Sequence, residues 1–238
     1  MSNFNIYDGL LFTSKPDLGA YGLKQIKSFG PQSRFGDLSK SVVTDLAAKQ
    51  PSSLTQETYY IDIENLPTSF KNSDLDKAES MIKLMSIIHA MKTERPTLNI
   101  GFYAILPERE YWHRTEEWKN RNDYYKPLAE FVDYVSPSLY TFYDDQLAWV
   151  QYAIENINEA KKYNKPIYPF IWPQYHPSSA LAGQLIPGDY WRLQLQTMQC
   201  AGADGVIIWG GWQIDWTSSI SETDHTNWWY QTLDFNNY

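Results

Sequence analysis

Short apolar segments alternate along this chain with longer segments that have the periodicity of amphipathic helices. Several of the short segments, such as Val206-Ile207-Ile208, are apolar on both sides, which is typical of strands that are covered on both faces. Strands that alternate with helices predict a parallel sheet with helical crossovers. Seven strands are predicted, at 4–10, 25–29, 58–64, 98–105, 134–140, 166–172 and 205–210.

The predicted helices lie between these strands. The clearest is at 74–92, where apolar residues repeat at spacings of three and four and Ser73 or Asp74 caps the start. Helices are also predicted from Asp144 or Asp145 to 162 and at 188–201, with weaker patterns at 115–132 and 224–233. The inward faces are predicted to hold Leu75, Ala78, Met81, Ile82, Met85, Ile88 and Met91 in the first helix, and Leu147, Val150, Ile154, Ile157 and Ala160 in the second.

The alternation of strands and helices alone is consistent with both a closed barrel and an open, doubly wound sheet. No Gly-x-Gly-x-x-Gly follows a strand and no Gly-Lys-Ser/Thr loop occurs, so the phosphate cradle that open sheets use for nucleotides is missing. The 238 residues suit one core of ordinary size. We therefore predict a TIM-like parallel β/α barrel with seven strands, as a single domain over 1–238.

Charge and composition exclude several classes of partner. The net charge of −8 argues against a general nucleic-acid binder, which needs a positive field, and no apolar run is long enough to cross a membrane. The single Cys200 cannot form a disulfide within the chain, and we expect it to be a small buried thiol on a helix. The four histidines have no metal-ligand spacing, so neither a metal nor a cofactor is expected. The compartment and the oligomeric state stay open.

Two carboxylates end the predicted strand at 58–64. Because side chains alternate along a strand, Tyr60, Asp62 and Glu64 share one face. Barrel enzymes keep their chemistry at the carboxyl ends of strands. Two acids close together in a poorly solvated pocket cannot both ionise easily, so one is pushed towards the protonated form that an acid catalyst needs. The alternative is that Asp62 caps a loop or pairs with a cation and that Glu64 is a solvated acid.

Aromatic residues make up 16% of the chain, including 10 Trp and 18 Tyr. Some of these rings are large core side chains, and others have the properties needed to line a groove and stack on the faces of sugars. Trp209 ends an apolar strand and is followed by two glycines, which leave space in front of its ring.

The order of several short motifs resembles that of the hyaluronidase-like glycoside hydrolases, over most of the chain. The most specific motif runs from Gly202 to Gly210 and is similar to the last barrel strand of that family. The other matching segments are Phe4-Asn5-Ile6-Tyr7, Ile61-Asp62-Ile63-Glu64, Val135-Ser136-Pro137-Ser138-Leu139-Tyr140 and Ile167-Tyr168-Pro169-Phe170-Ile171-Trp172-Pro173-Gln174-Tyr175.

The resemblance implies a retaining hydrolysis in which the substrate's own N-acetyl oxygen attacks the anomeric carbon. It implies that Glu64 is the proton donor and then the base for water, and that Asp62 holds the acetamido group or tunes Glu64. By the same resemblance Tyr140 and Tyr175 position or polarise the acetamido group, and Trp209 walls the sugar subsite. Further substrate contacts are expected from Trp172, Tyr103, Trp212 and Asp215, with Trp216 as an outer contact.

The chain also departs from the family. The disulfides of its secreted members are absent, and Gly101-Phe102-Tyr103-Ala104 replaces the family's exit from the fourth strand. Because hyaluronan carries a carboxylate on every second sugar, the acidic chain favours a less charged N-acetylhexosamine polymer. Two alternatives stay open: a barrel glycosidase with a second protein carboxylate, for which Glu108 and Glu110 are candidates, and a carbohydrate-binding barrel without turnover.

Overall fold

The computed structural model describes residues 4–29, 57–63, 73–112, 114–221 and 223–236. Contacts within the chain divide it into two compact units, which are described separately below. Unit 1 comprises Met1–Gln25, Pro137–Lys162 and Pro166–Tyr238, and unit 2 comprises Ile26–Ser136 and Tyr163–Lys165. Each unit is built from segments that are not continuous in the sequence. The single domain expected over 1–238 stays a prediction.

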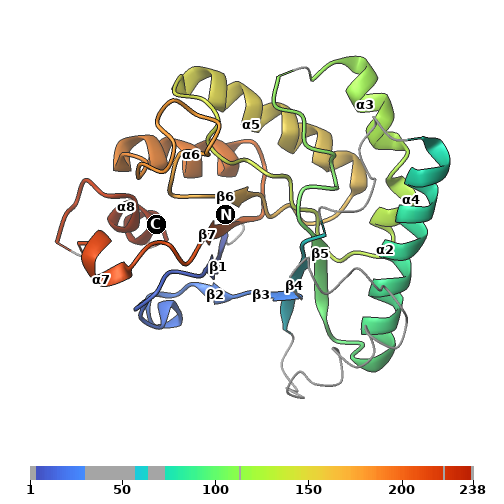
Figure 1. The fold of residues 1–238 in the computed structure, drawn as a ribbon, viewed down its shortest axis with the longest axis horizontal. Helices are drawn as coiled ribbons and strands as arrows, with labels where there is room; N and C mark the ends of the chain where they lie inside the picture. The colour runs from blue at the N-terminus through green and yellow to red at the C-terminus, as the bar shows by residue number, and fades with distance from the viewer. Residues whose placement is uncertain (1–3, 30–56, 64–72, 113, 222, 237–238) are drawn as a thin grey trace. The chain divides into compact units, whose positions relative to one another are not determined.

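Unit 1 contains a four-stranded parallel sheet in the order β2-β1-β7-β6 (Figure 1). The strands are β1 (Asn5–Leu10), β2 (Lys24–Gln25), β6 (Phe170–Ile171) and β7 (Gly205–Gly210). β1 pairs with β7 over its whole length, from Asn5 opposite Gly205 to Leu10 opposite Gly210. A Cβ atom at Gly205 would lie 2.2 Å from the carbonyl oxygen of Asn5, so only glycine allows this close pairing.

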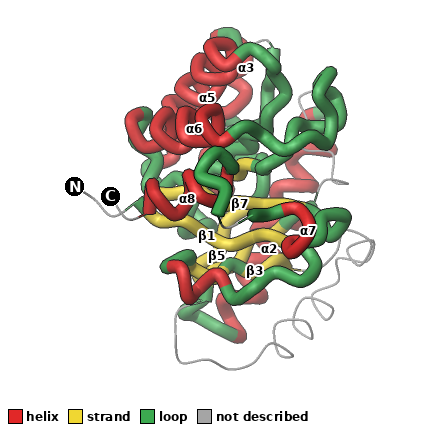
Figure 2. The backbone as a smooth tube through the Cα atoms, turned by 90° about the vertical axis from the view of Figure 1, so that its left-hand side faces the viewer, coloured by secondary structure: helices red, strands yellow, loops and turns green. Residues whose placement is uncertain are grey.

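The helices of unit 1 cover this sheet with aromatic side chains. In Figures 1 and 2, α5 and α6 lie side by side, and α6 also packs against α8 and β7. Trp149, Trp191, Trp228 and Trp229 are fully buried. The helical elements are η1 (Leu18–Tyr21), α5 (Gln146–Ala160), α6 (Gly188–Cys200), α7 (Trp216–Ser219) and α8 (Trp228–Asn236), with η3 (Lys161–Tyr163) directly after α5.

Unit 2 contains a three-stranded parallel sheet in the order β3-β4-β5. The strands are β3 (Lys27–Phe29), β4 (Thr58–Ile61) and β5 (Asn99–Phe102), and the helices are α2 (Asp74–Glu94), α3 (Glu116–Asp123) and α4 (Lys126–Ala129). The side chain of Ser73 caps α2, as predicted. A Cβ atom at Gly101 would lie 2.4 Å from the ring of Tyr134, whose hydroxyl donates to the Tyr59 carbonyl oxygen at 2.6 Å.

The α/β fold with parallel sheets is confirmed, and the number of barrel strands stays a prediction. The segment 134–140, predicted to be a strand, forms only isolated bridges, which include Tyr103 to Ser136 in unit 2 and Ser138 to Phe170 in unit 1. The predicted strand at 25–29 is divided between β2 and β3.

Two predictions about burial are wrong in part and one is wrong outright: Ile88 and Met91 of α2 and Ile157 and Ala160 of α5 are buried as predicted, but other predicted residues are exposed, and so is Cys200. The buried face of α2 is formed by Ser80, Leu84, Ile87, Ile88, Ala90 and Met91, whereas Leu75 and Ile82 are 69% and 63% exposed. In α5 the aromatic residues Trp149 and Tyr152 take the inner face, and Leu147 is 76% exposed. Cys200, in the last turn of α6, is exposed and not buried as predicted.

Candidate functional site

Three aromatic side chains gather at the carboxyl ends of the strands of unit 1. Trp209 is the penultimate residue of β7, Trp172 directly follows β6, and Tyr140 comes two residues after the bridge from Ser138 to β6. The ring centroids are 5.1 Å apart for Trp172 and Trp209, 5.6 Å for Tyr140 and Trp172, and 5.8 Å for Tyr140 and Trp209. We call Tyr140, Trp172 and Trp209 the aromatic wall.

Two rings of the aromatic wall are partly exposed to solvent, and hydrogen bonds hold the ring of Trp172 in place. Trp172 and Trp209 are half-buried, and Tyr140 is buried. The indole N–H of Trp172 donates to Oε1 of Gln174 at 3.0 Å, and Nε2 of Gln174 donates to the carbonyl oxygen of Gly183 at 2.6 Å. A rigid ring loses little conformational entropy when a ligand stacks on it, so this support favours a binding role.

Gln174 and His176 were not identified as site residues from the sequence. The His176 ring lies 6.3 Å from Trp172 and 6.5 Å from Tyr140, measured between centroids. The alternation of side chains in an extended segment puts Trp172, Gln174 and His176 on one side, and this spacing is the signal that could have found them.

Tyr175, between Gln174 and His176, is buried. Its backbone forms a bridge with Thr141, directly after Tyr140, and its ring lies 6.3 Å from that of Tyr190. Burial raises the pKa of Tyr175, and the negative charges of Asp144 and Asp189 raise it further. The phenol therefore stays protonated around neutral pH and keeps a hydrogen-bond donor.

In the loop after β7, Trp212 is exposed to solvent, whereas Asp215 forms hydrogen bonds that hold the local structure. Trp212 is 68% exposed. The carboxylate of Asp215 caps α7 through the Ser218 N–H and accepts the hydroxyl of Ser14 at 2.7 Å. Hydrogen bonds, first from Thr217 and then from Ser14, lower the pKa of Asp215. These bonds give Asp215 a structural role, and its contact with substrate stays a prediction.

Trp216 was expected to be an outer contact of the site, and this expectation is wrong. It is 4% exposed and packs against the rings of Phe12, Trp228 and Trp229. Trp216 is the first residue of α7, and these contacts with rings from distant parts of the sequence bury it.

An ion pair not predicted from the sequence lies on the carboxyl half of β1. Nζ of Lys15 contacts Oδ1 of Asp8 at 2.7 Å and donates to the Leu10 carbonyl oxygen at 2.9 Å. The side chains of Asp8 and Lys15 are 12% and 19% exposed. The pair neutralises a carboxylate at the edge of the sheet where the aromatic wall lies.

The other expected site residues belong to unit 2. Asp62 directly follows β4 and is half-buried, and Tyr103 directly follows β5 and is 8% exposed. β4 and β5 are paired up to Ile61 and Phe102, and the N–H of Tyr103 donates to the Ile61 carbonyl oxygen at 3.0 Å. Asp62 and Tyr103 thus extend adjacent strands by one residue each. Glu64 lies outside the described residues.

Groups of metal ligands and membrane-spanning helices are both absent from the described residues. In that part of the chain, no three or more His, Cys, Asp or Glu side chains gather in a way that could hold a metal ion. None of its helices combines the length and the apolar character that crossing a membrane requires.

No family model and no curated protein matches the sequence. Two crystal structures of bee venom hyaluronidase, one of them in complex with a hyaluronic acid tetramer, are 17% identical to this chain. They match 99% of it and 96% and 95% of their own chains, with TM-scores of 0.67 and 0.69. An endo-β-1,4-mannanase double mutant from Cellulomonas fimi matches 92% of this chain and 55% of its own, at 11% identity and a TM-score of 0.55.

At these identities the likeness establishes the fold. The resemblance read from the sequence motifs is confirmed at that level, because the similarity to hyaluronidase extends over nearly the whole chain. The chain has the parallel α/β fold of TIM-barrel glycosidases and is a distant structural relative of bee venom hyaluronidase.

Proposed function

We propose that this protein is a glycoside hydrolase that cleaves a polysaccharide containing N-acetylhexosamine. The observation that supports the proposal best is the aromatic wall, in which three rings at the carboxyl ends of parallel strands contact one another and two of them, Trp172 and Trp209, stay partly exposed. Aromatic faces of this kind bury the C–H surface of a sugar while their polar edges stay hydrogen-bonded. Barrel enzymes carry their active sites at this end of the strands.

In the proposed reaction the acetamido oxygen of the substrate attacks the anomeric carbon as the glycosidic C–O bond breaks. Glu64 gives its proton to the leaving oxygen, and its carboxylate then takes a proton from the water that opens the cyclic intermediate. Asp62 holds the acetamido N–H or tunes Glu64, and the pairing of two carboxylates keeps Glu64 protonated before the attack. The configuration at the anomeric carbon is retained.

The remaining residues orient the sugar in this proposal. Tyr140 and Tyr175 position the acetamido group, and the protonated phenol of Tyr175 suits a donor to its carbonyl oxygen. Trp209 and Trp172 stack on the sugar, while Tyr103, Trp212 and Asp215 contact it further out. Seven barrel strands and a single domain belong to the same proposal.

The substrate class follows from charge. The chain carries a net charge of −8. A polymer with many carboxylates is repelled by such a field, so a neutral or weakly charged glycan of the chitin or peptidoglycan type is proposed.

A glycan panel tests the proposal. The wild-type protein is incubated with N-acetylated chito-oligosaccharides, peptidoglycan, hyaluronan and the corresponding de-N-acetylated polymers, and new reducing ends are measured. The expected result is hydrolysis of N-acetylated chito-oligosaccharides or peptidoglycan, with little hydrolysis of hyaluronan or of the de-N-acetylated polymers. Equal hydrolysis of de-N-acetylated glycans would favour a second protein carboxylate, and binding without hydrolysis would indicate a carbohydrate-binding barrel; either result would overturn the proposed mechanism.

A further inference from the structure

Unit 2 has a cavity of about 260 Å³ that the proposed reaction does not use. Its walls come from α2, from α3 with the turn that follows it, and from the segment after β5. The lining includes Lys77, Glu108, Asn120, Arg121, Tyr124 and Tyr125.

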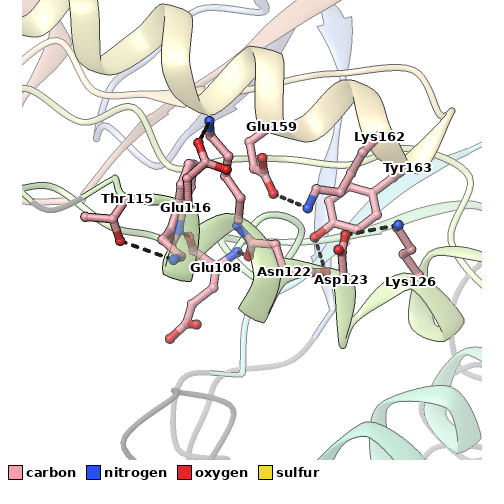
Figure 3. A network of polar contacts seen from close by, with 11 residues as sticks. Glu108, Thr115, Glu116, Asn122, Asp123, Lys126, Glu159, Lys162 and Tyr163 are labelled. Atoms are coloured by element: carbon pink, nitrogen blue, oxygen red, sulfur yellow. Dashed lines mark hydrogen bonds and ion pairs between the residues drawn. The ribbon is translucent and has the colours of Figure 1, made fainter.

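The backbone of Glu108 is fixed at both of its polar groups. Its N–H donates to Oδ1 of Asn122 at 2.9 Å, and its carbonyl oxygen accepts the indole N–H of Trp118 at 2.8 Å. Asn122 and Trp118 are 0% and 1% exposed. Figure 3 shows the Glu108 carboxylate extending away from Asn122. These hydrogen bonds fix the backbone of residue 108, so the position from which its side chain extends is preorganised.

The charges around the cavity are matched. Nζ of Lys77 lies 2.7 Å from Oδ1 of Asp74, and the guanidinium of Arg121 lies 3.3 Å from Glu117 and 4.0 Å from Glu108. Each cation therefore has a carboxylate near it, and the cavity offers no strong field to a free anion or a metal ion. The accessible lining of the cavity is mostly apolar, so a neutral ligand with apolar faces and few buried polar groups suits such walls better.

Carbon surface lies between these polar groups. Nζ of Lys77 is 5.2 Å from the centre of the Tyr124 ring, and the Tyr124 hydroxyl donates to the carbonyl oxygen of Asp74 at 3.2 Å. Tyr125 is 2% exposed, and burial, followed by the charge of Glu108, raises the pKa of its phenol. Two fixed rings and the aliphatic part of Lys77 thus flank polar atoms that can donate and accept.

We propose that this cavity binds a single neutral sugar residue. Its volume is below the range typical of drug-sized ligands, about 300–1,000 Å³, and suits one ring. The tyrosine rings and the Lys77 stem would contact the C–H faces of the sugar, while Glu108, Asn120 and Arg121 would exchange hydrogen bonds with its hydroxyls. The cavity lining contains none of Glu64, Asp62, Tyr140 and Tyr175, and the proposal does not depend on turnover.

The test measures the binding of methyl glycosides of glucose, mannose and N-acetylglucosamine by ligand-observed NMR. All proteins carry Trp209→Ala, so that the aromatic wall contributes little. Asn120→Trp places a bulky ring in the cavity from an exposed position of α3, and it is expected to weaken the preferred glycoside by at least about tenfold. Lys119→Trp, one residue earlier and outside the cavity lining, is the matched control and should bind like its parent.

Glu108→Gln provides a second readout because it removes the charge without touching the backbone bonds of residue 108. It is expected to weaken the same glycoside by about tenfold, the size of a lost charge-assisted hydrogen bond. Circular dichroism confirms that each variant is folded. The proposal is overturned if no glycoside binds the parent protein, or if folded Asn120→Trp and Glu108→Gln bind as the parent does. If the proposed hydrolysis by Glu64 and Asp62 were absent, the result of this binding test would be unchanged.

Discussion

Trp209 lies at the end of β7 where the buried residues of the core give way to the aromatic wall. Ile207 lies two residues earlier on the same face and is fully buried, whereas Trp209 is half-buried and contacts two other rings. The sequence identified this ring because two glycines follow it. A Cβ atom at Gly211 would be 3.9 Å from the Trp209 ring, an ordinary van der Waals distance, so Gly211 is not needed to make room for that ring.

Replacing Trp209 by alanine is expected to weaken the binding of chito-oligosaccharides by about 1–3 kcal/mol, because the stacking surface is lost. Isothermal titration calorimetry checks this value. Trp112→Ala removes an indole that is 61% exposed in unit 2 and serves as the matched control. An unchanged dissociation constant for Trp209→Ala would mean that the ring only packs against its neighbours.

Single residues were predicted well where their local chemistry decides their role, and poorly where tertiary packing does. Asp145 caps α5 through the N–H groups of residues 147 and 148, as the preference of aspartate for this position predicts. Trp216 and Cys200 could not be placed, because their burial depends on contacts between segments distant in sequence. The functional roles of the expected site residues stay predictions: Glu64, Asp62, Tyr140, Tyr175, Trp209, Trp172, Tyr103, Trp212 and Asp215.

Among the elements, β7 was predicted with its bounds, because a strand covered on both faces is continuously apolar. β1 was predicted to within one residue, although it contains Asn5 and Asp8. α2 was predicted to within two residues at its end, but its buried face was not. Apolar residues occur around much of that helix, so the pattern fixes its existence and leaves open which residues turn inward. The segment 134–140 has the composition of a strand and forms only bridges.

The sheet of unit 2 is anchored near its amino end by Glu57, just before β4. Its carboxylate accepts from Nζ of Lys27 at 2.6 Å and from the guanidinium of Arg95, and it is 12% exposed. Glu57→Gln is expected to lower the free energy of unfolding at pH 7 by about 1.5–3 kcal/mol, because two charge-assisted hydrogen bonds are weakened. Chemical denaturation measures the change.

The control for Glu57 is Asp123→Asn, which breaks the exposed pair with Lys126. Its side chains are 49% and 54% exposed, and the expected loss is below about 1 kcal/mol. Equal losses in the two variants would show that the contacts of Glu57 add nothing beyond an ordinary surface pair.

The stabilisation by Glu57 depends on pH. Burial alone would raise its pKa, but the hydrogen bonds from Lys27 and Arg95 outweigh burial and lower it from the usual 4.5. A lowered carboxyl pKa in the folded state stabilises the protein above pH 4.5, and this contribution is lost as the pH falls below 4.5. The difference in unfolding free energy between wild type and Glu57→Gln should therefore shrink on acidification.

At the scale of the whole molecule, two parallel sheets and the covering helices resemble hyaluronidase over 99% of the chain. The fold class could be predicted from the strand and helix alternation, because crossover connections require parallel strands. The chemistry could not be settled in the same way, because unrelated functions share this fold and the acid at 64 lies outside the described residues.

The most direct test of the proposed hydrolysis compares wild type with Glu64→Gln on the N-acetylated glycan that the panel selects. The glutamine variant should release reducing ends about 10²–10⁴ times more slowly, since a general acid–base group is lost, while its affinity for the oligosaccharide stays nearly constant. If Glu64→Gln hydrolyses the glycan as fast as wild type does, Glu64 is not the acid and the proposed mechanism is wrong.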